Sequence, residues 1–219
     1  MNLVLIGGGA LALEVLSFIS SKRAAVTDAA EDIIYVVCPN GNRAEDLRRV
    51  YANLNMVRSI AEIDVPGGFE GLVCVGDATA RLRLFREYDG CFSRWASVIH
   101  PSANIMPSAQ IGEGVIIAPG AYVGPLAKIG DNVLVNVGAS IGHDANIGHS
   151  SVISPQAAIN GFAECGSATF VGAAAALLPS ASLGSHCKLS AGSVFSGCVT
   201  NGFLLHGNPA KGRQMFSVE

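Results

Sequence analysis

Large aliphatic side chains recur at almost every sixth position in the second half of the chain. The spacing runs from Ile99 to Phe195 without an insertion or a deletion. A small or β-branched residue stands two positions before most of the large ones, and a glycine often follows directly. The series opens with Ile99, Ile105, Ile111, Ile117 and Val123, and closes with Val171, Leu177, Leu183, Leu189 and Phe195.

A fixed period of six constrains the fold strongly, because short internal repeats are the mark of solenoids. An α-helix has about 3.6 residues per turn, so this pattern would spread the apolar residues around its whole surface. The period instead fits a parallel β-helix, in which three short strands form one triangular coil of ~18 residues. We expect residues 94–198 to form about five such coils, stacked at the strand spacing of ~4.8 Å.

The first 93 residues follow a different pattern, in which short apolar runs alternate with helical spacing. Such alternation predicts a parallel sheet of right-handed βαβ units, here about half of a dinucleotide-binding fold. We therefore expect a Rossmann-like α/β unit at 1–93, the β-helix at 94–198, and a tail at 199–219 that caps the open end of the coils. The expected strands are Leu3–Ile6, Ile33–Cys38 and Gly71–Val75, and the expected helices are Ala10–Lys22, a stretch around Arg43–Arg48 and a stretch from Arg81 to Glu87.

Composition narrows the class of protein. Half of the residues are hydrophobic, but no run of about eighteen apolar residues occurs, so we expect no membrane partner. The net charge of −3 argues against a nucleic-acid partner. Met1–Ile6 is followed directly by glycines, without a basic leader, which predicts no signal peptide. The six cysteines form no CxxC pair, and Cys165 and Cys187 fall on inward repeat positions, so a reduced cytoplasmic protein is expected.

A glycine-rich loop follows the first expected strand and opens the first expected helix, with the spacing G-x-G-x-x-A. Backbone N–H groups at a helix N-terminus can bind phosphate. Three interpretations stand: a nicotinamide cofactor site, a site for the diphosphate of a nucleotide-linked substrate, or glycines needed only for a tight turn. A nicotinamide site calls for an acid after the second strand, where Cys38-Pro39-Asn40 stand, so a substrate diphosphate is favoured. The candidate substrate-binding residues are Gly7, Gly8, Gly9, Ala10, Leu11, Gly76 and Asp77.

His143 interrupts the repeat two positions after the inward Ile141, so we expect it at a corner of the coil, facing outward. Asp144 follows directly and could orient the imidazole and raise its basicity, as a carboxylate does for a general base. The alternative is a solvated surface histidine. His149 has the same phase one face further round the coil, so the two side chains should point from different corners.

The combination resembles the left-handed β-helix sugar acyltransferases of the sialic acid and bacillosamine pathways. The resemblance covers nearly the whole chain. It is carried by the hexapeptides together with Gly7, Gly9, Glu14, Val15, Gly76-Asp77, Arg81, His100-Pro101-Ser102-Ala103, Asn136-Val137-Gly138, His143-Asp144 and Gly207-Asn208-Pro209-Ala210-Lys211.

This resemblance implies a site and a mechanism. His143 would be the general base, polarised by Asp144, and the acceptor would attack the thioester of acetyl-CoA directly. A backbone N–H near Gly161 would stabilise the oxyanion. The pantetheine arm would lie between two β-helices of a homotrimer, near the loop Gly207–Lys211. The implied acetyl-CoA-binding positions are Gly161, Gly172, Ala173, Ala191 and Gly192.

Two positions depart from the family pattern. A histidine commonly found in the glycine loop is Leu11 here, and the acids after the second strand are replaced by Cys38-Pro39-Asn40. The expected function is an acetyl-CoA-dependent N-acetyltransferase of a nucleotide-linked amino sugar, without a metal. Sugar O-acetylation of the sialic acid type and a non-catalytic nucleotide-sensing scaffold remain alternatives. A metal-dependent hydratase would need three histidines, and only His143 and His149 have suitable positions, since His100, His186 and His206 lack the matching spacing.

Overall fold

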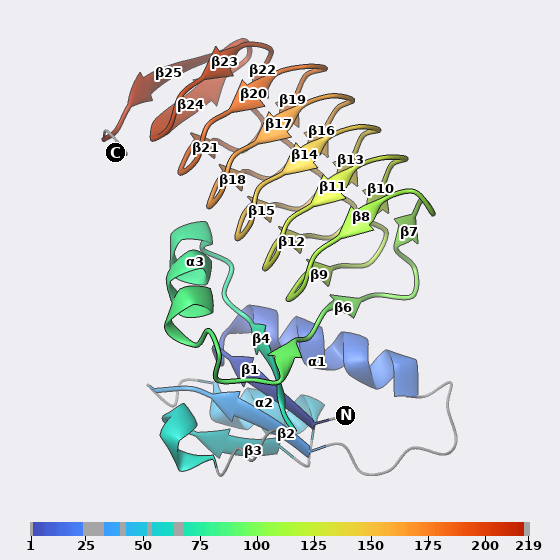
Figure 1. The fold of residues 1–219 in the computed structure, drawn as a ribbon, viewed down its shortest axis with the longest axis vertical. Coiled ribbons are helices and arrows are strands. Elements are labelled where there is room, and N and C mark those ends of the chain that lie inside the picture. Colours follow the sequence, from blue (N-terminus) through green and yellow to red (C-terminus); the bar gives the residue numbers. More distant parts are fainter. Residues whose placement is uncertain (1, 24–32, 40–42, 52–53, 64–67, 217–219) are drawn as a thin grey trace.

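The computed structural model describes residues 2–23, 33–39, 43–51, 54–63 and 68–216. Figure 1 shows a small α/β unit below a long stack of β-strand coils. Asn40, which belongs to one of the sequence predictions, lies outside the described residues. The α/β unit consists of β1 (Asn2–Ile6), α1 (Ala10–Arg23), β2 (Ile33–Val37), α2 (Ala44–Val50), β3 (Leu54–Val57), a 3-10 turn (Ile60–Glu62), β4 (Glu70–Val73), α3 (Ala78–Glu87) and β5 (Arg94–Trp95).

The five strands of this unit form one parallel sheet in the order β3-β2-β1-β4-β5. The chain leaves β1 toward β2 and β3, and later returns to the other side of β1 with β4 and β5. The parallel βαβ arrangement is confirmed, whereas β3 and β5 were not predicted from the sequence. Arg94 and Trp95 thus lie in this sheet, although the repeat pattern assigned them to the β-helix.

The β-helix consists of two-residue strands separated by four-residue turns. Three sheets run along it: β7 to β22, β8 to β23, and β6 to β25. We call them the β7, β8 and β6 faces. The strands are β6 (Val98–Ile99), β7 (Asn104–Ile105), β8 (Gln110–Ile111), β9 (Ile116–Ile117), β10 (Tyr122–Val123), β11 (Lys128–Ile129), β12 (Leu134–Val135), β13 (Ser140–Ile141), β14 (Asn146–Ile147), β15 (Val152–Ile153), β16 (Ala158–Ile159), β17 (Glu164–Cys165), β18 (Phe170–Val171), β19 (Ala176–Leu177), β20 (Ser182–Leu183), β21 (Lys188–Leu189), β22 (Val194–Phe195) and β23 (Cys198–Val199).

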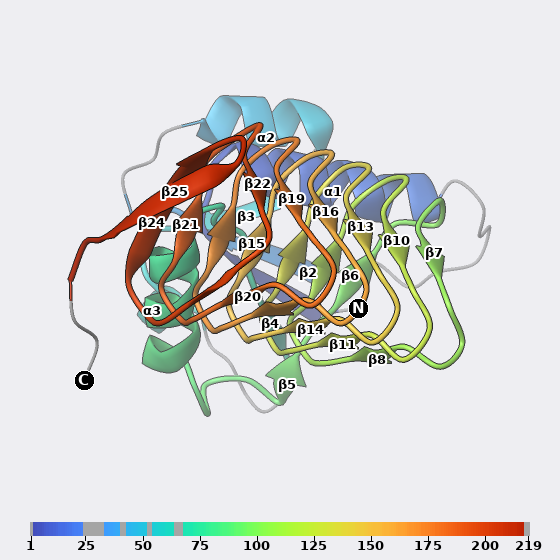
Figure 2. The same cartoon turned by 90° about the horizontal axis from the view of Figure 1, so that it is seen from above.

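The predicted register is confirmed through most of the stack. Leu134 pairs with Val152, and corresponding residues of successive coils are 18 positions apart. The spacing falls to 16 where Ser182 pairs with Cys198 and where Lys188 pairs with Leu204, because the last coil is two residues shorter. The inward residues form one continuous apolar core, which includes Cys165 and Cys187 as predicted. Figure 2 shows the nested coils from above.

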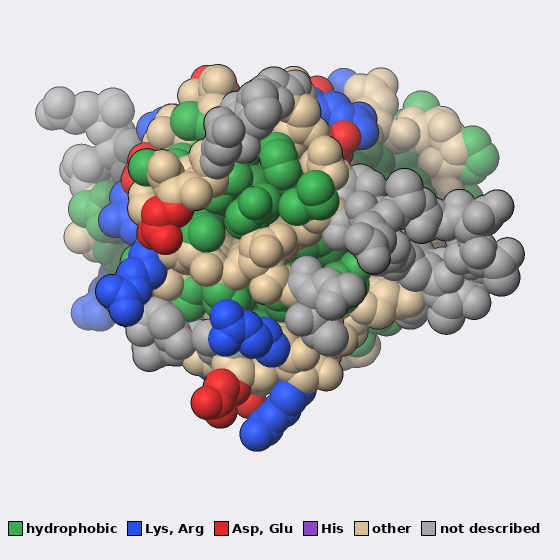
Figure 3. Space-filling view, turned by 90° about the horizontal axis from the view of Figure 1, so that it is seen from below, with side chains coloured by type: hydrophobic (Ala, Val, Ile, Leu, Met, Phe, Trp, Pro, Cys, Tyr) green, Lys and Arg blue, Asp and Glu red, His purple; other side chains and the backbone are tan. Residues whose placement is uncertain are grey.

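The β6 face carries apolar residues on its outer side as well as its inner side, and the α/β unit covers them. Val98, Ile116, Leu134 and Val152 are at most 5% exposed and share a core cluster with residues of α1 and β1. The covered face fixes how the two parts of the chain sit against each other. Figure 3, seen from below, shows acidic and basic side chains mixed on the face of the α/β unit rather than gathered by sign.

The C-terminal segment extends the β6 face. β24 (Phe203–Gly207) pairs in parallel with β21, and β25 (Ala210–Gln214) returns antiparallel to it. Leu205 is 1% exposed and lies in the core of the last coil. Among the described residues, no helix has the length and apolar character needed to cross a bilayer.

Candidate functional site

His143 and Asp144 occupy the turn between β13 and β14, at the corner where the β7 and β8 faces meet. Asp144 has a φ of 58°, a left-handed conformation that aspartate tolerates better than most residues. Nδ1 of His143 lies 3.0 Å from Oδ2 of Asp144. The imidazole is 57% exposed and the carboxylate 32% exposed. The predicted pair is therefore formed at a corner, facing outward.

The hydrogen bond assigns the imidazole tautomer. An ionised carboxylate only accepts hydrogen bonds, so Nδ1 of His143 carries the proton that is donated to Asp144. Nε2 then has a free lone pair in the neutral ring. A histidine in this state can accept a proton from a nucleophile, which is the requirement for a general base.

Gly161 lies one coil beyond His143, directly against the imidazole. A Cβ built on Gly161 would be 2.6 Å from Nε2 and 2.7 Å from Cε1 of His143. Among the hydrogen bonds of the described residues, the N–H of Gly161 has no acceptor, although its carbonyl accepts from Ser180. Gly161 therefore brings its Cα close to Nε2 of His143, and its N–H is a backbone donor left without an acceptor in the same turn.

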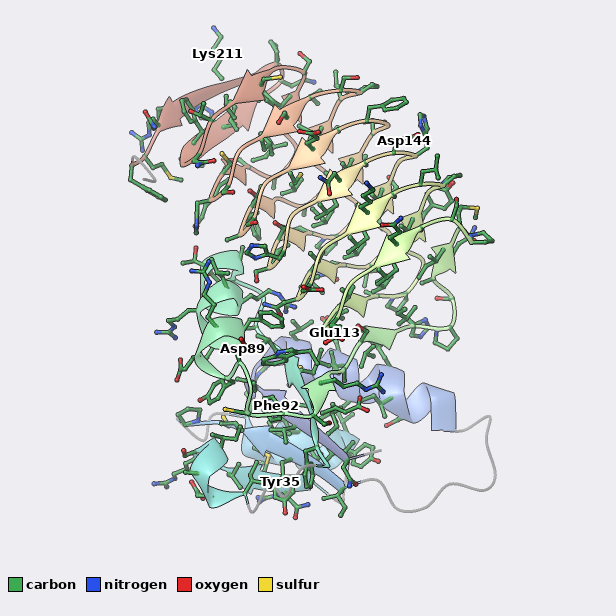
Figure 4. All side chains as sticks on the ribbon, viewed as in Figure 1. Tyr35, Asp89, Phe92, Glu113, Asp144 and Lys211 are labelled. Atoms are coloured by element: carbon green, nitrogen blue, oxygen red, sulfur yellow. The ribbon has the colours of Figure 1, made fainter. Side chains whose placement is uncertain are left out.

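The corner that holds His143 and Asp144 lies opposite the face that the α/β unit covers. The coil is triangular, and the β6 face is the side that does not contain His143. Figure 4 shows Asp144 on the outer edge of the stack, away from the α/β unit. His143 therefore points away from the α/β unit of its own chain.

The positions implied for acetyl-CoA do not meet within one chain. Gly161 lies beside His143, whereas Gly172 and Ala173 follow β18, at the corner between the β6 and β7 faces. Ala191 and Gly192 lie in the next coil at that second corner, where the N–H of Gly192 donates to the carbonyl of Ala173 at 2.8 Å. The two groups stand at opposite edges of the β7 face. The loop Gly207–Lys211 forms the turn of the β24–β25 hairpin.

The glycine loop lies where β1 and β4 end side by side, at the point where strand order reverses. Parallel α/β sheets bind ligands in the crevice at such a point. Gly9 and Gly76 face open space and remain available to a ligand. Gly7 has a φ of 113°, and a Cβ on it would lie 2.8 Å from Val75 Cγ2. A Cβ on Gly8 would lie 2.6 Å from Cys38 Sγ. Close packing against neighbouring residues therefore also requires glycine at Gly7 and Gly8.

Three further predicted substrate residues have different roles. Asp77 is the N-cap of α3, where its Oδ1 accepts a hydrogen bond from the N–H of Ala80 at 2.8 Å. Leu11 is 9% exposed and packs in the core of the α/β unit. Ala10 begins α1 and is exposed. The position of Leu11 therefore supplies packing rather than a polar group for a ligand.

The other histidines are scattered. His149 is exposed at the corner between the β8 and β6 faces, as predicted. His100 contacts the ring of Phe18 on α1 at 5.3 Å between centroids. In the described part of the chain, no three His, Cys, Asp or Glu side chains lie close enough to hold a metal ion.

A groove of about 380 Å³ runs along the β8 face beside the dyad of His143 and Asp144. Sequence reasoning did not find it, although every strand on this face carries a polar or small residue at its outward position. The lining residues are Gln110, Leu126, Lys128, Asp144, Asn146 and Glu164.

Arg81 is a second feature that sequence reasoning left without a role. Its side chain is fully buried between the α/β unit and the β-helix. It donates to the carbonyls of Val73 and Val75, and to the carbonyl and Oδ1 of Asn132 in a β-helix turn. Burial lowers the pKa of Arg81 to about 10, an effect that the nearby Cys74 thiol opposes. Arg81 therefore joins the end of β4, next to Gly76, to the β-helix.

Sequence comparison finds a bacterial transferase hexapeptide family (six repeats), which matches residues 96–125. No curated protein is significantly similar in sequence. Solved structures match along almost the whole chain. The acetyltransferase domain of PglB from Neisseria gonorrhoeae FA1090 is 24% identical with a TM-score of 0.83, over 96% of this chain and 98% of that one.

Two other similar structures come from different bacteria. PerB from Caulobacter crescentus, solved in complex with CoA and GDP-perosamine, is 27% identical with a TM-score of 0.77, over 97% of both chains. WeeI from Acinetobacter baumannii AYE is 18% identical with a TM-score of 0.81, over 97% of this chain and 100% of that one. Together with the hexapeptide match and the sheet topology, these findings confirm the predicted fold and resemblance. The chain therefore has a left-handed β-helix with hexapeptide repeats, and it is similar over almost its whole length to the PglB acetyltransferase domain and to PerB.

Proposed function

We propose that the chain is an acetyl-CoA-dependent N-acetyltransferase that acts on a nucleotide-linked amino sugar. The observation that carries the proposal is the arrangement at one corner of the coil. His143 is held by Asp144, and its Nε2 lies close to Gly161, whose backbone N–H has no acceptor among the hydrogen bonds of the described residues. Base and oxyanion donor are the two groups that acyl transfer requires.

In this mechanism Nε2 of His143 removes a proton from the acceptor amine as the nitrogen attacks the thioester carbonyl carbon. The N–H of Gly161 donates to the carbonyl oxygen, which becomes negatively charged in the tetrahedral state. When the C–S bond breaks, the imidazolium returns its proton to the departing thiolate of CoA. Asp144 keeps the ring oriented throughout and stabilises its positive charge.

Similar structures support the choice of substrates. PerB was solved with CoA and GDP-perosamine, and the PglB domain was solved with acetyl coenzyme A. Two further PerB structures carry asparagine or alanine in place of one histidine. For this chain we assign the acetyl donor to the β-helix, from β6 to the β24–β25 hairpin, and the nucleotide sugar to the α/β unit, which ends with β5.

Within the α/β unit, the crevice at the ends of β1 and β4 is the proposed site of the sugar nucleotide diphosphate. Gly9 and Gly76 leave it open, and the N-terminus of α1 faces it with a partial positive charge. The described residues contain one glycine loop after a strand and one five-stranded parallel sheet, which is about half of a dinucleotide-binding fold. This favours a substrate diphosphate over a nicotinamide cofactor.

We also propose that the active form is a homotrimer. His143 points away from the α/β unit of its own chain, and Gly172 and Ala173 stand at the opposite edge of the β7 face. In a trimer, the corner of one chain that holds His143 would lie against the α/β unit of its neighbour and against the neighbour's corner that holds Gly172 and Ala173. Acetyl-CoA and nucleotide sugars are cytoplasmic metabolites, so we place the enzyme in the cytoplasm.

The test is release of free thiol from acetyl-CoA in the presence of UDP-, GDP- and dTDP-linked amino sugars. We expect one nucleotide sugar to support turnover and to gain one acetyl group by mass spectrometry. Neutral hydroxylamine then separates the two acceptor atoms, because it cleaves an acetyl ester but not an acetamide. Acetyl transfer that hydroxylamine reverses would replace N-acetylation by O-acetylation, and no transfer to any of the sugars would refute the proposal.

A further inference from the structure

Phe162 combines two properties that ordinarily disfavour a phenylalanine. Its φ is 60°, in the left-handed region that bulky side chains avoid. Its side chain is 58% exposed, so burial does not compensate for the strained backbone. Apart from Leu126, the other turns of the β-helix with this conformation hold small or polar residues. These residues are Gly114, Gly120, Asn132, Gly138, Asp144, Ser150, Gln156, Ala168, Ala174, Ser180, His186 and Gly192.

The contacts of Phe162 point to His143. The ring centroids of the two side chains are 5.1 Å apart and the planes are at 88°, an edge-to-face arrangement. The N–H of Phe162 also donates to the carbonyl of His143 at 3.0 Å. Phe162 lies one coil beyond Asp144, so it flanks the dyad on the side of Gly161. Strained residues of this kind gather at functional sites.

The imidazole needs such a contact, because its other constraints leave it free to turn. Asp144 holds Nδ1 through a single hydrogen bond between partly exposed groups, and water competes for such a bond. Gly161 limits the ring on one side by close approach. An aromatic edge on a further side restricts rotation about the Cβ–Cγ bond of His143 and so keeps Nε2 beside the N–H of Gly161.

We infer that Phe162 is a positioning residue for His143. Its ring holds the imidazole in the orientation in which Nδ1 meets Asp144 and Nε2 faces the site of proton transfer. The kinetic consequence rests on the proposed function, whereas the ordering of the ring is a property of the resting protein. The inference therefore has one readout that needs no turnover.

Leu126 offers a matched control. It lies one coil before Asp144, as Phe162 lies one coil after, and it has the same φ of 60°. It is 57% exposed, almost the same as Phe162, and is also apolar. Replacement of either residue by alanine keeps the backbone strain, because alanine still has a Cβ, and removes a similar exposed surface. Only Phe162→Ala removes the ring against His143.

The experiment compares Phe162→Ala, Phe162→Tyr and Leu126→Ala with the wild type. For Phe162→Ala we expect kcat to fall about tenfold, since small misplacement of a reacting group is costly, while KM for acetyl-CoA and for the sugar stays within twofold. Phe162→Tyr keeps the ring edge and should retain the wild-type kcat, whereas Leu126→Ala, which changes the wall of the groove on the β8 face, should leave the ring signals of His143 unchanged. In ¹⁵N-histidine NMR, we expect the His143 ring signals of a single Nδ1–H tautomer in the wild type and averaged signals in Phe162→Ala alone.

Other results would overturn the inference. A raised KM for acetyl-CoA at unchanged kcat would make Phe162 part of the ligand-binding wall. Equal effects of Phe162→Ala and Leu126→Ala, or altered subunit association in Phe162→Ala, would assign the ring to general surface packing. Unchanged ring signals in Phe162→Ala would remove the positioning role. If no sugar is acetylated by the wild type but the ring signals change as expected, the positioning role stands and the proposed function fails.

Discussion

Replacement of Gly161 by alanine should separate catalysis from stability. Residues at the equivalent place in other turns, Ser167, Ala173 and Ala191, carry a Cβ, so the backbone at this position accepts alanine. The new Cβ would lie 2.6 Å from Nε2 of His143, and ordinary contact begins at 3.4 Å. The imidazole must therefore move by ~0.8 Å, taken as the difference between these distances.

This movement should affect activity far more than folding. Misplacement of a reacting group by about 1 Å costs on the order of 10²-fold in rate, which is about 2.7 kcal/mol in activation free energy. The imidazole is exposed, so its displacement should change the free energy of unfolding by less than about 1 kcal/mol. We expect Gly161→Ala to lower kcat about 100-fold while the urea midpoint stays close to that of the wild type.

Gly148→Ala is the control with the opposite expectation. Its Cβ would lie 2.6 Å from the backbone N of Ser167 and 2.7 Å from the backbone C of Gly166. Coils cannot separate locally without loss of hydrogen bonds, so the cost should appear as several kcal/mol of stability. Circular dichroism in urea and the thiol-release assay measure both effects. Wild-type kcat in Gly161→Ala, or a stability loss as large as that of Gly148→Ala, would refute the reasoning.

Three further predictions concern the joint, the buried thiols and the glycine loop. Arg81→Met removes the donor to three buried acceptors and to the partly buried carbonyl of Val75, and should lower the free energy of unfolding by about 3–5 kcal/mol. The exposed Arg83→Met should change it by less than about 0.5 kcal/mol, and equal urea midpoints of the two variants would contradict this. Burial raises the pKa of the Cys165 thiol to about 12 from 9.0, so the folded state keeps a proton that the unfolded chain loses, and stability falls as pH rises from 9 toward 12. In thermal melts, Cys165→Ala should lessen that decline by about 1.4 kcal/mol per pH unit. An unchanged slope of stability against pH would show that the thiol is not protected. Gly7→Ala should lower the free energy of unfolding by about 2 kcal/mol or more, because Gly7 has a φ of 113° and lies against the end of β4. Gly9→Ala should lower it by about 1 kcal/mol or less and should raise KM for the sugar nucleotide. An unchanged KM in Gly9→Ala would argue against the diphosphate site.

Much of the β-helix could be predicted because its signal is repeated in every coil. The six-residue period specified which side chain faces inward, and it placed His143 and His149 on different corners. The features of the β-helix that the sequence did not predict are those that the six-residue period does not specify. The last coil is two residues shorter, and the outer apolar residues of the β6 face carry no periodic signal that names the α/β unit as their cover.

The α/β unit was predicted less completely because its elements are short and single. β5 has two residues and pairs only through its neighbour β4, so no local pattern marks it as a strand. Leu11 lies one residue beyond the glycine loop, yet the helix turns its side chain into the core. From the sequence alone, Arg81 looks like one of several charged residues on the exposed side of an amphipathic helix. Its buried position depends on Asn132, which is 51 residues away in the chain.

The site shows the same limit. Asp144 follows His143 in the chain, so the pair could be inferred from adjacency. Phe162 is 19 residues beyond His143, and its contact arises from the coil stacking. The signal that could have found it is an aromatic residue in the turn position that, apart from Leu126, holds small or polar residues in the other coils.

The most direct test of the central claim is the rate of acetyl transfer by His143→Asn at saturating substrates, with His149→Asn as the matched control. Both histidines are exposed and share one phase of the repeat, but only His143 has a carboxylate partner and the Gly161 N–H beside it. Loss of a general base costs about 10²–10⁴-fold, so we expect His143→Asn to fall by at least 100-fold and His149→Asn to retain wild-type activity. Full activity in His143→Asn, or equal losses in the two variants, would contradict the account.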